Sequence, residues 1–167
     1  MLDKLYYFQS ILGSLLTSGA EWDTLDINYE KPHVQRVWRQ IGDYRISLHR
    51  IFPCEIHECF FHPHPWPSAI KIESGRYEMS IGYGSGLEPK TNITKLILPA
   101  GSYYEMTDFD AWHSVRPLDI PVMSLMITGK PWNRIMPKSD KVKLSSLSNQ
   151  NRDEIMNYFI SKYPNNK

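Results

Sequence analysis

The spacing of apolar residues predicts a helix at each end of the chain. From residue 3 to residue 18, apolar side chains recur every three or four positions and form one stripe of an amphipathic helix. The stripe consists of Leu5, Phe8, Ile11, Leu12, Leu15 and Leu16. Residues 148–163 show a second helical pattern, for which Ser148 or Asn149 is a suitable N-cap.

Between these helices the period of the apolar residues changes to two, which is typical of strands. Residues 34–41 and 44–52 flank a Gly-Asp turn and predict a β-hairpin. One face of its second strand carries Ile46, Leu48 and Arg50, and the other face carries Arg45, Ser47, His49 and Ile51. Further short apolar runs, separated by turn residues, predict strands at 56–61, 69–72, 77–83, 94–98, 103–106, 112–115 and 122–128.

The number of these strands points to one β domain. Seven or more short strands without a helical pattern between them favour an antiparallel sandwich or barrel over alternating βα units. The length of 167 residues suits a single domain, residues 1–167, and the chain shows no repeat or linker. We therefore predict a mainly β fold, with an antiparallel barrel over about residues 34–130 between two terminal helices. Residues 20–32 are interpreted as a connector.

Charge and composition narrow the class of partner. The net charge is only +1, so no field of one sign favours nucleic acid or an anionic membrane, and a small molecule is the expected substrate. No apolar run approaches the ~20 residues needed to span a bilayer. Asp3 stands where a signal peptide would carry positive charge, and there are only two cysteines. We expect a cytoplasmic protein.

The most informative segment contains two closely spaced histidines, His62 and His64. Pro63, Pro65 and Pro67 exclude a helix there and favour extended backbone. In an extended segment, residues two apart point to the same side and lie roughly 7 Å apart along the strand. The two imidazoles can therefore converge on one ion. The alternative is that the segment is only a stiff, proline-rich rim.

Two histidines need at least a third group to hold a divalent ion firmly. His113, in the segment AWHSVRP on a later predicted strand, is the best candidate. Glu78 and Glu58 are possible carboxylate ligands, and Asp108 and Asp110 could orient an imidazole. The predicted metal set is therefore His62, His64 and His113, with Glu78 as a possible addition.

A competing zinc site would use Cys54, His57 and Cys59 in the segment CEIHEC. Zinc sites built on thiolates usually have a gap of two to four residues between ligands and need a fourth ligand. By parity, the two cysteines lie on opposite faces of a regular strand. We therefore expect inert, buried thiols at these positions rather than a zinc site.

The histidine segment resembles the first motif of the cupins, which are small jelly-roll barrels. That motif has a His-X-His pair, then an acidic residue and then a glycine, and here His62, His64 and Gly75 fall on the same spacing. Ser68 stands where the family has its glutamate. The second motif begins Pro-X-Gly, which residues 99–101 match, but Tyr104 stands where the family has its histidine. The resemblance covers roughly residues 46–128.

A narrower resemblance is to an uncharacterised group of bacterial and phage cupin-like proteins with a His-X-His-Pro-Trp segment. The matching segments are HPHPW, GRYE, HSV and MITGKPW. This group implies a metal-binding jelly-roll barrel without a settled reaction.

Cupins with three histidines include iron enzymes that dioxygenate thiols or activated carbon acids. The resemblance therefore implies that the three histidines hold Fe(II), with Zn, Ni or Mn as other divalent ions. Tyr104 or Tyr77 would position substrate or oxygen, and Arg76 or Arg116 would pair with a substrate carboxylate. The apolar wall of the site would come from Trp66, Trp112 and Phe60.

Two other functions fit the same sequence. One is a non-catalytic cupin that binds or senses a small molecule or peptide, with a structural metal or none. The other is a metal-independent isomerase that uses histidine as a general base. Because barrels of this kind often pair through edge strands, a homodimer is a further expectation.

Overall fold

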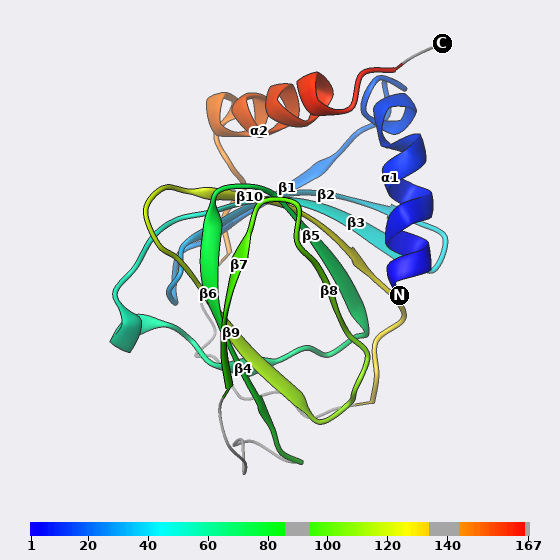
Figure 1. Ribbon diagram of the computed structural model, residues 1–167. Helices are drawn as coiled ribbons and strands as arrows, with labels where there is room; N and C mark the ends of the chain where they lie inside the picture. The colour runs from blue at the N-terminus through cyan, green and yellow to red at the C-terminus, as the bar shows by residue number, and fades with distance from the viewer. Residues whose placement is uncertain (86–93, 134–143, 166–167) are drawn as a thin grey trace.

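Two antiparallel sheets face each other in the computed structural model, which describes residues 1–85, 94–133 and 144–165 (Figure 1). The larger sheet has the strand order β1-β2-β3-β10-β5-β8, and the smaller sheet has the order β4-β9-β6-β7. This arrangement is the predicted mainly β jelly roll with a helix at each end. The sheets face each other as two layers rather than closing into one continuous ladder of described strands.

The strands of the larger sheet are β1 (Asp23–Ile27), β2 (Val34–Ile41), β3 (Tyr44–Ile51), β5 (Ser68–Ser74), β8 (Tyr103–Met106) and β10 (Val122–Thr128). Those of the smaller sheet are β4 (His62–Pro63), β6 (Arg76–Tyr83), β7 (Thr94–Pro99) and β9 (Ala111–Pro117). The helices are α1 (Leu2–Leu16), α2 (Asn149–Lys162) and the short 3-10 helix η1 (Ile56–Glu58).

Both α-helices cover the outer face of the larger sheet (Figure 1). Their buried residues pack on outward-facing side chains of β2, β3, β5 and β10, and together they form the larger apolar core. On β3, Ile46 and Leu48 belong to this core, whereas Arg45 and His49 turn to the interior between the sheets, as the alternation of the hairpin predicts. Ser148 caps α2 by accepting a hydrogen bond from the Asn151 amide at 3.2 Å.

Two glycines make the tight turns of this fold possible. Gly42 joins β2 to β3 with φ +56°, and Gly75 joins β5 to β6 with φ +73°. A side chain is strained at such angles. At Gly75, a Cβ atom would also lie 3.0 Å from the Val122 side chain. The glycine of the cupin-like motif is thus required by the backbone.

Two local predictions are wrong. The predicted connector at residues 20–32 contains strand β1, which pairs with β2 along its whole length and turns Leu25 and Ile27 to the interior. Tertiary pairing supplies a strand that the local pattern does not show. Residues 56–61 do not form a strand, because Glu55 and Glu58 close a capping box around η1.

The described helices are too short or too polar to cross a lipid bilayer. The predicted loop at residues 84–89 lies mostly outside the described residues.

Candidate metal centre

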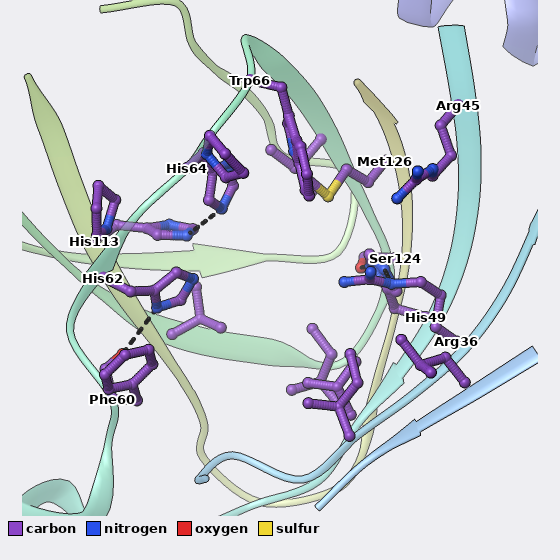
Figure 2. Close-up of a pocket in the computed structure, with 18 of the residues that line it drawn as sticks. Arg36, Arg45, His49, Phe60, His62, His64, Trp66, His113, Ser124 and Met126 are labelled. Atoms are coloured by element: carbon purple, nitrogen blue, oxygen red, sulfur yellow. Dashed lines mark hydrogen bonds between the residues drawn. The ribbon is translucent and has the colours of Figure 1, made fainter. Parts of the chain in front are cut away.

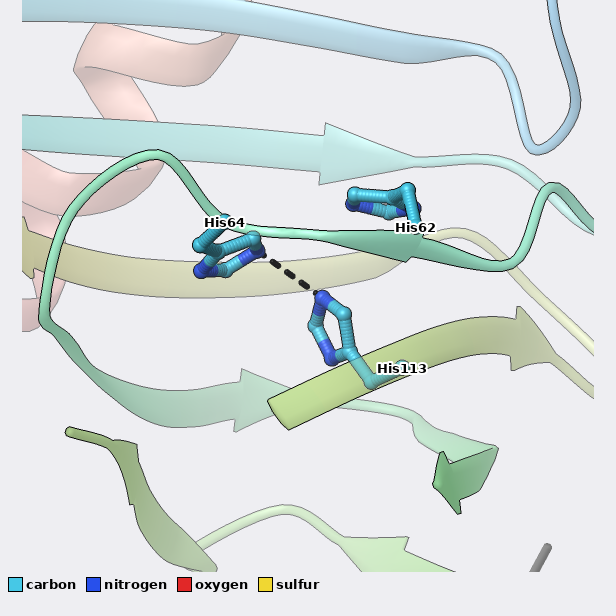
Figure 3. A group of neighbouring side chains, drawn as sticks. All are labelled: His62, His64 and His113. Carbon is cyan, nitrogen blue, oxygen red and sulfur yellow. Dashed lines mark hydrogen bonds between the residues drawn. The ribbon is translucent and has the colours of Figure 1, made fainter. Parts of the chain in front are cut away.

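The structure brings His62, His64 and His113 together (Figure 3). Strand β4 is only two residues long, but its pairing with β9 places His62 directly opposite His113. His64 follows β4 in the chain and turns to the same point. One ligand atom from each ring lies within 4.8 Å of the others, and the Nε2 atoms of His64 and His113 are 2.9 Å apart.

Hydrogen bonds on the far side of two of the rings orient them toward this point. The Nδ1 atom of His62 lies 3.1 Å from the Phe60 carbonyl, to which it donates. The Nδ1 atom of His64 lies 2.9 Å from the Ser68 hydroxyl. A donor role for Nδ1 leaves the Nε2 lone pair free, and this arrangement commonly fixes metal-ligating histidines. Ser68 thus contacts the candidate ligand His64 from the position at which the cupin motif has an acidic ligand.

Burial keeps the three imidazoles neutral. It lowers the pKa of His62 and holds the pKa values of His64 and His113 well below the usual histidine value. The neighbouring imidazoles lower the latter two pKa values further. Neutral imidazole is the form that binds a metal ion.

The spacing of the nitrogens fits a divalent ion. Two histidine nitrogens that each lie about 2.0–2.1 Å from one ion are roughly 2.8–3.4 Å apart at bond angles between octahedral and tetrahedral values. The 2.9 Å separation between His64 and His113 falls in this range. The third ring, His62, lies next to both, with ring centroids 5.6 Å from His64 and 5.0 Å from His113. One ligand atom of His62 therefore lies within 4.8 Å of a ligand atom of each of the other two rings.

The histidines line one wall of a cavity of about 480 Å³ between the two sheets (Figure 2). Phe60 stacks on His62, with 5.1 Å between ring centroids, and Trp66 lines the cavity beside His64. Trp112 was expected to share this wall. Its indole instead turns to the other side of β9 and donates a hydrogen bond to the Gly84 carbonyl at 2.9 Å.

Tyr77 and Tyr104 also reach the cavity, and their hydroxyls form a hydrogen bond of 2.6 Å. Burial raises the pKa of both phenols, so both remain protonated at neutral pH. The ring of Tyr104 lies 6.4 Å from that of His113 between centroids. The two tyrosines predicted to position a ligand are therefore neighbours of the histidine cluster.

The structure does not bring the predicted arginines or Glu78 to the cavity. Arg76 is exposed and pairs with Asp119 at 2.9 Å. Glu78 lies 3.7 Å from Arg116 on the outer face of the smaller sheet, because inward positions of β6 are those with the parity of Tyr77. The sequence prediction is thus wrong in placing these residues at the site: Arg76, Arg116 and Glu78.

The remaining acidic candidates also lie away from the cluster. Glu58 accepts the Glu55 amide hydrogen bond at 3.0 Å within the capping box. Asp108 accepts a hydrogen bond from the Asp110 amide at 2.8 Å, within the loop that precedes β9. Among the described residues, therefore, the group that could hold an ion consists of histidines alone.

The competing site at Cys54, His57 and Cys59 does not assemble as a metal site among the described residues. The two sulfur atoms do meet, at 3.4 Å, because the chain turns through η1 instead of running as a strand. Burial raises the pKa of Cys59 to about 12, and its hydrogen bond with Cys54 contributes to the rise. A raised pKa disfavours the thiolate, which is the form that binds zinc.

This pKa gives a prediction for chemical labelling. Because the Cys59 thiol titrates near pH 12, thiolate is scarce at pH 8, and we expect iodoacetamide to label Cys59 far more slowly in the native protein than in urea. The rate should still rise with pH between 8 and 10. Peptide mass spectrometry at each pH measures it, and equal rates in native and unfolded protein would contradict the assignment.

Three cavity residues were not singled out from the sequence: Arg36, Arg45 and His49. They lie on β2 and β3, across the cavity from the histidine cluster (Figure 2). The sequence contained one indication of their position: side chains alternate along the second strand of the hairpin, which places Arg45 and His49 on the same face as the apolar Ile51. Charged side chains on an inward strand face are a sign of a functional cavity.

The contact between Ser68 and His64 gives a second prediction. Ser68→Ala removes the group that orients the His64 ring, and loss of such a partner typically weakens metal affinity by about 10- to 100-fold. Competition with a fluorescent chelator measures this change. Ser74→Ala, at the other end of β5, is a matched control that should leave metal affinity unchanged, and an equal effect of both substitutions would contradict the role of Ser68.

No family model and no curated protein matches this sequence. Solved structures do share its fold. Hydroxypropylphosphonic acid epoxidase from S. wedmorenis aligns with a TM-score of 0.52 at 12% identity, over 65% of this chain and 55% of that chain. The structure of FeII HppE gives a TM-score of 0.51 at 12% identity, over 65% and 56% of the two chains.

A further structure, Fe(II)-HppE with the alternative substrate (S)-1-HPP, aligns with a TM-score of 0.53 at 11% identity over the same 65% and 56% of the two chains. The region shared with this chain thus spans little more than half of each of these structures. At such low identity the likeness concerns the fold, and it agrees with a cupin-like jelly roll.

Proposed function

We propose that this protein binds a divalent metal ion, Fe(II) in its working form, and acts as an oxygen-dependent enzyme on a small molecule. One observation carries the proposal: three neutral imidazoles converge within 4.8 Å at the wall of a cavity large enough for a small ligand. The choice of iron is supported by the structures of Fe(II) HppE, which share the fold. Zinc, nickel and manganese are the other ions to be tested.

Each group of the cavity has a part in this proposal. His62, His64 and His113 hold the ion, and three neutral ligands would leave it with its full double charge and with open positions for substrate and oxygen. The hydroxyl pair of Tyr77 and Tyr104 supplies one neutral donor close to His113. The apolar remainder of the wall, including Phe60 and Trp66, excludes water from the reacting groups.

A second candidate is a binding protein without catalysis. The direct contact between His64 and His113 favours it, because one Nε2 atom can donate to the other and these two nitrogens are then paired without an ion. In that case the cavity would hold a small molecule and the histidines would be ligand contacts.

One experiment separates the two functions. The protein is loaded with Fe(II) under argon, its bound iron is measured, and oxygen uptake is then followed with a panel of organic acids and thiols. The proposal expects roughly one tightly held iron per chain and oxygen uptake with at least one compound. Iron binding without oxygen uptake across the panel, together with ligand binding that survives chelation, would favour the binding protein.

A further inference from the structure

The wall opposite the histidine cluster carries two positive charges, from Arg36 on β2 and Arg45 on β3 (Figure 2). Both side chains line the same cavity as the histidines. The residues of known position that line this cavity include no aspartate or glutamate. The cavity is therefore cationic at one wall and neutral at the other.

Arg36 and Arg45 line the cavity without an acidic partner in the part of the chain that the structure describes, unlike Arg50 and Arg152. On the outer face of the same sheet, Arg50 pairs with Glu154 at 2.5 Å, and Arg152 on α2 pairs with Asp153 at 2.9 Å. Across the described ranges, by contrast, neither Arg36 nor Arg45 has a carboxylate within 4.0 Å. A charge withdrawn from water without a counter-ion is costly, and a bound anion would offset that cost.

His49 positions the guanidinium of Arg36. The Arg36 Nε atom donates to His49 Nε2 at 2.8 Å, and the other ring nitrogen, Nδ1, lies 3.5 Å from the Ser124 hydroxyl. Burial holds the pKa of His49 well below its usual value, which leaves Nε2 free to accept this bond. Because Nε is engaged by His49, the two terminal nitrogens of Arg36 remain for a ligand.

Tryptophans position Arg45 from two sides. Its guanidinium lies 4.5 Å from the ring centroid of Trp38 and 5.5 Å from that of Trp66. The Arg45 Nε atom is buried, and no group of the described chain accepts a hydrogen bond from it. Trp66 also lines the cavity, so the stack places a donor without an acceptor at the cavity wall.

The two guanidinium groups also influence each other. Burial and, secondarily, the positive charge of Arg45 lower the pKa of Arg36 to about 10. Arg36 is still a cation at neutral pH, and the repulsion between the two guanidinium groups would be relieved by an anion between them. The planar fork of a guanidinium matches a carboxylate or a phosphoryl group.

We propose that Arg36 and Arg45, with His49 as a positioning residue, form an anion subsite that selects a small organic acid as the ligand of this cavity. The acid group would be held on the larger sheet, and the rest of the molecule would extend toward His62, His64 and His113. The description of this ligand as a substrate rests on the proposed function, whereas the anion subsite itself does not require a metal ion.

Binding of simple anions tests this subsite. Isothermal titration calorimetry with the full chain, both metal-loaded and chelator-treated, would compare propanoate, inorganic phosphate and the neutral propanamide. We expect propanoate or phosphate to bind in both forms and propanamide to bind at least about 10-fold more weakly. A preference for phosphate over propanoate assigns the subsite to phosphoryl groups, and the reverse assigns it to carboxylates.

Variants identify the residues involved. Arg36→Gln and Arg45→Gln should each weaken anion binding by roughly 10- to 100-fold, whereas Arg152→Gln, which removes an exposed charge, should leave it unchanged. His49→Leu should weaken binding, and His49→Gln, which keeps an acceptor for Arg36, should restore part of it.

Two results would overturn the proposal: equal affinity of the wild-type protein for propanoate and propanamide, or wild-type affinity in both arginine variants. The wild-type comparison decides the matter even if a variant does not fold. A wild-type protein that binds the metal ion but none of the anions would overturn this inference alone, and a wild-type protein that binds anions but no metal ion would overturn only the metal-dependent function.

Discussion

His113→Ala is expected to abolish tight metal binding. Structural metal sites with four protein ligands contribute about 10–16 kcal/mol of binding free energy, so one ligand accounts for about 2.5–4 kcal/mol, or roughly 70- to 900-fold in affinity. His113 is also the candidate ligand whose Nε2 atom lies 2.9 Å from that of His64, and the other two candidate ligands come from a single short segment. Iron content after gel filtration, measured by plasma emission spectroscopy, gives the result.

His57→Ala is the matched control, because His57 is an exposed histidine on η1 outside the cluster. Iron content should remain at the wild-type value in this variant. Equal iron content in His113→Ala and the wild-type protein would move the metal centre elsewhere. Circular dichroism on each variant verifies that the loss of iron is not a loss of fold.

Phe159→Ala is expected to lower the free energy of unfolding by about 3–5 kcal/mol, the usual cost of removing a buried phenylalanine ring. Phe159 has no exposed surface and joins α2 to the core that both helices share with the larger sheet. In a chain of this length, that loss corresponds to a fall in Tm of roughly 10 °C. Urea titration followed by tryptophan fluorescence measures the change in free energy.

Tyr7→Ala offers an aromatic control on α1, since its side chain is 58% exposed. We expect this change to cost less than about 1 kcal/mol. Iron binding should persist in folded Phe159→Ala, because α2 covers the outer face of the sheet and the histidines lie in the interior. A destabilisation no larger than that of Tyr7→Ala would contradict the packing of α2.

Much of the fold follows from short-range pattern. The period of two places Ile46 and Leu48 under the helices and Arg45 and His49 in the interior, as the structure shows. The prediction from local pattern is wrong where the secondary structure depends on contacts that the pattern does not contain. The β1 segment becomes a strand only because β2 provides a partner, and local polar contacts of Glu55 and Glu58 replace a strand by a turn of 3-10 helix.

In the candidate site, too, local sequence pattern predicts some residues and not others. The convergence of His62 and His64 could be expected from their spacing, and His113 from its place on a strand, because residue type and parity limit the choices. The arginines could not be assigned in this way. Parity gives the face of a strand but not which strands meet across the interior, so the sequence prediction names Arg76 or Arg116, whereas the structure places Arg36 and Arg45 at the cavity.

Strand β5 has one face toward the interior between the two sheets and the other toward the α-helices, and its side chains alternate between these two faces. The even-numbered side chains turn to the interior between the sheets: Ser68, Ile70 and Ile72. The odd-numbered side chains turn to the helices and the segment after α2: Ala69, Lys71 and Glu73. A library of single substitutions at residues 68–73 should therefore sort by number, with even positions changing ligand retention and odd positions changing protease resistance at the chain ends.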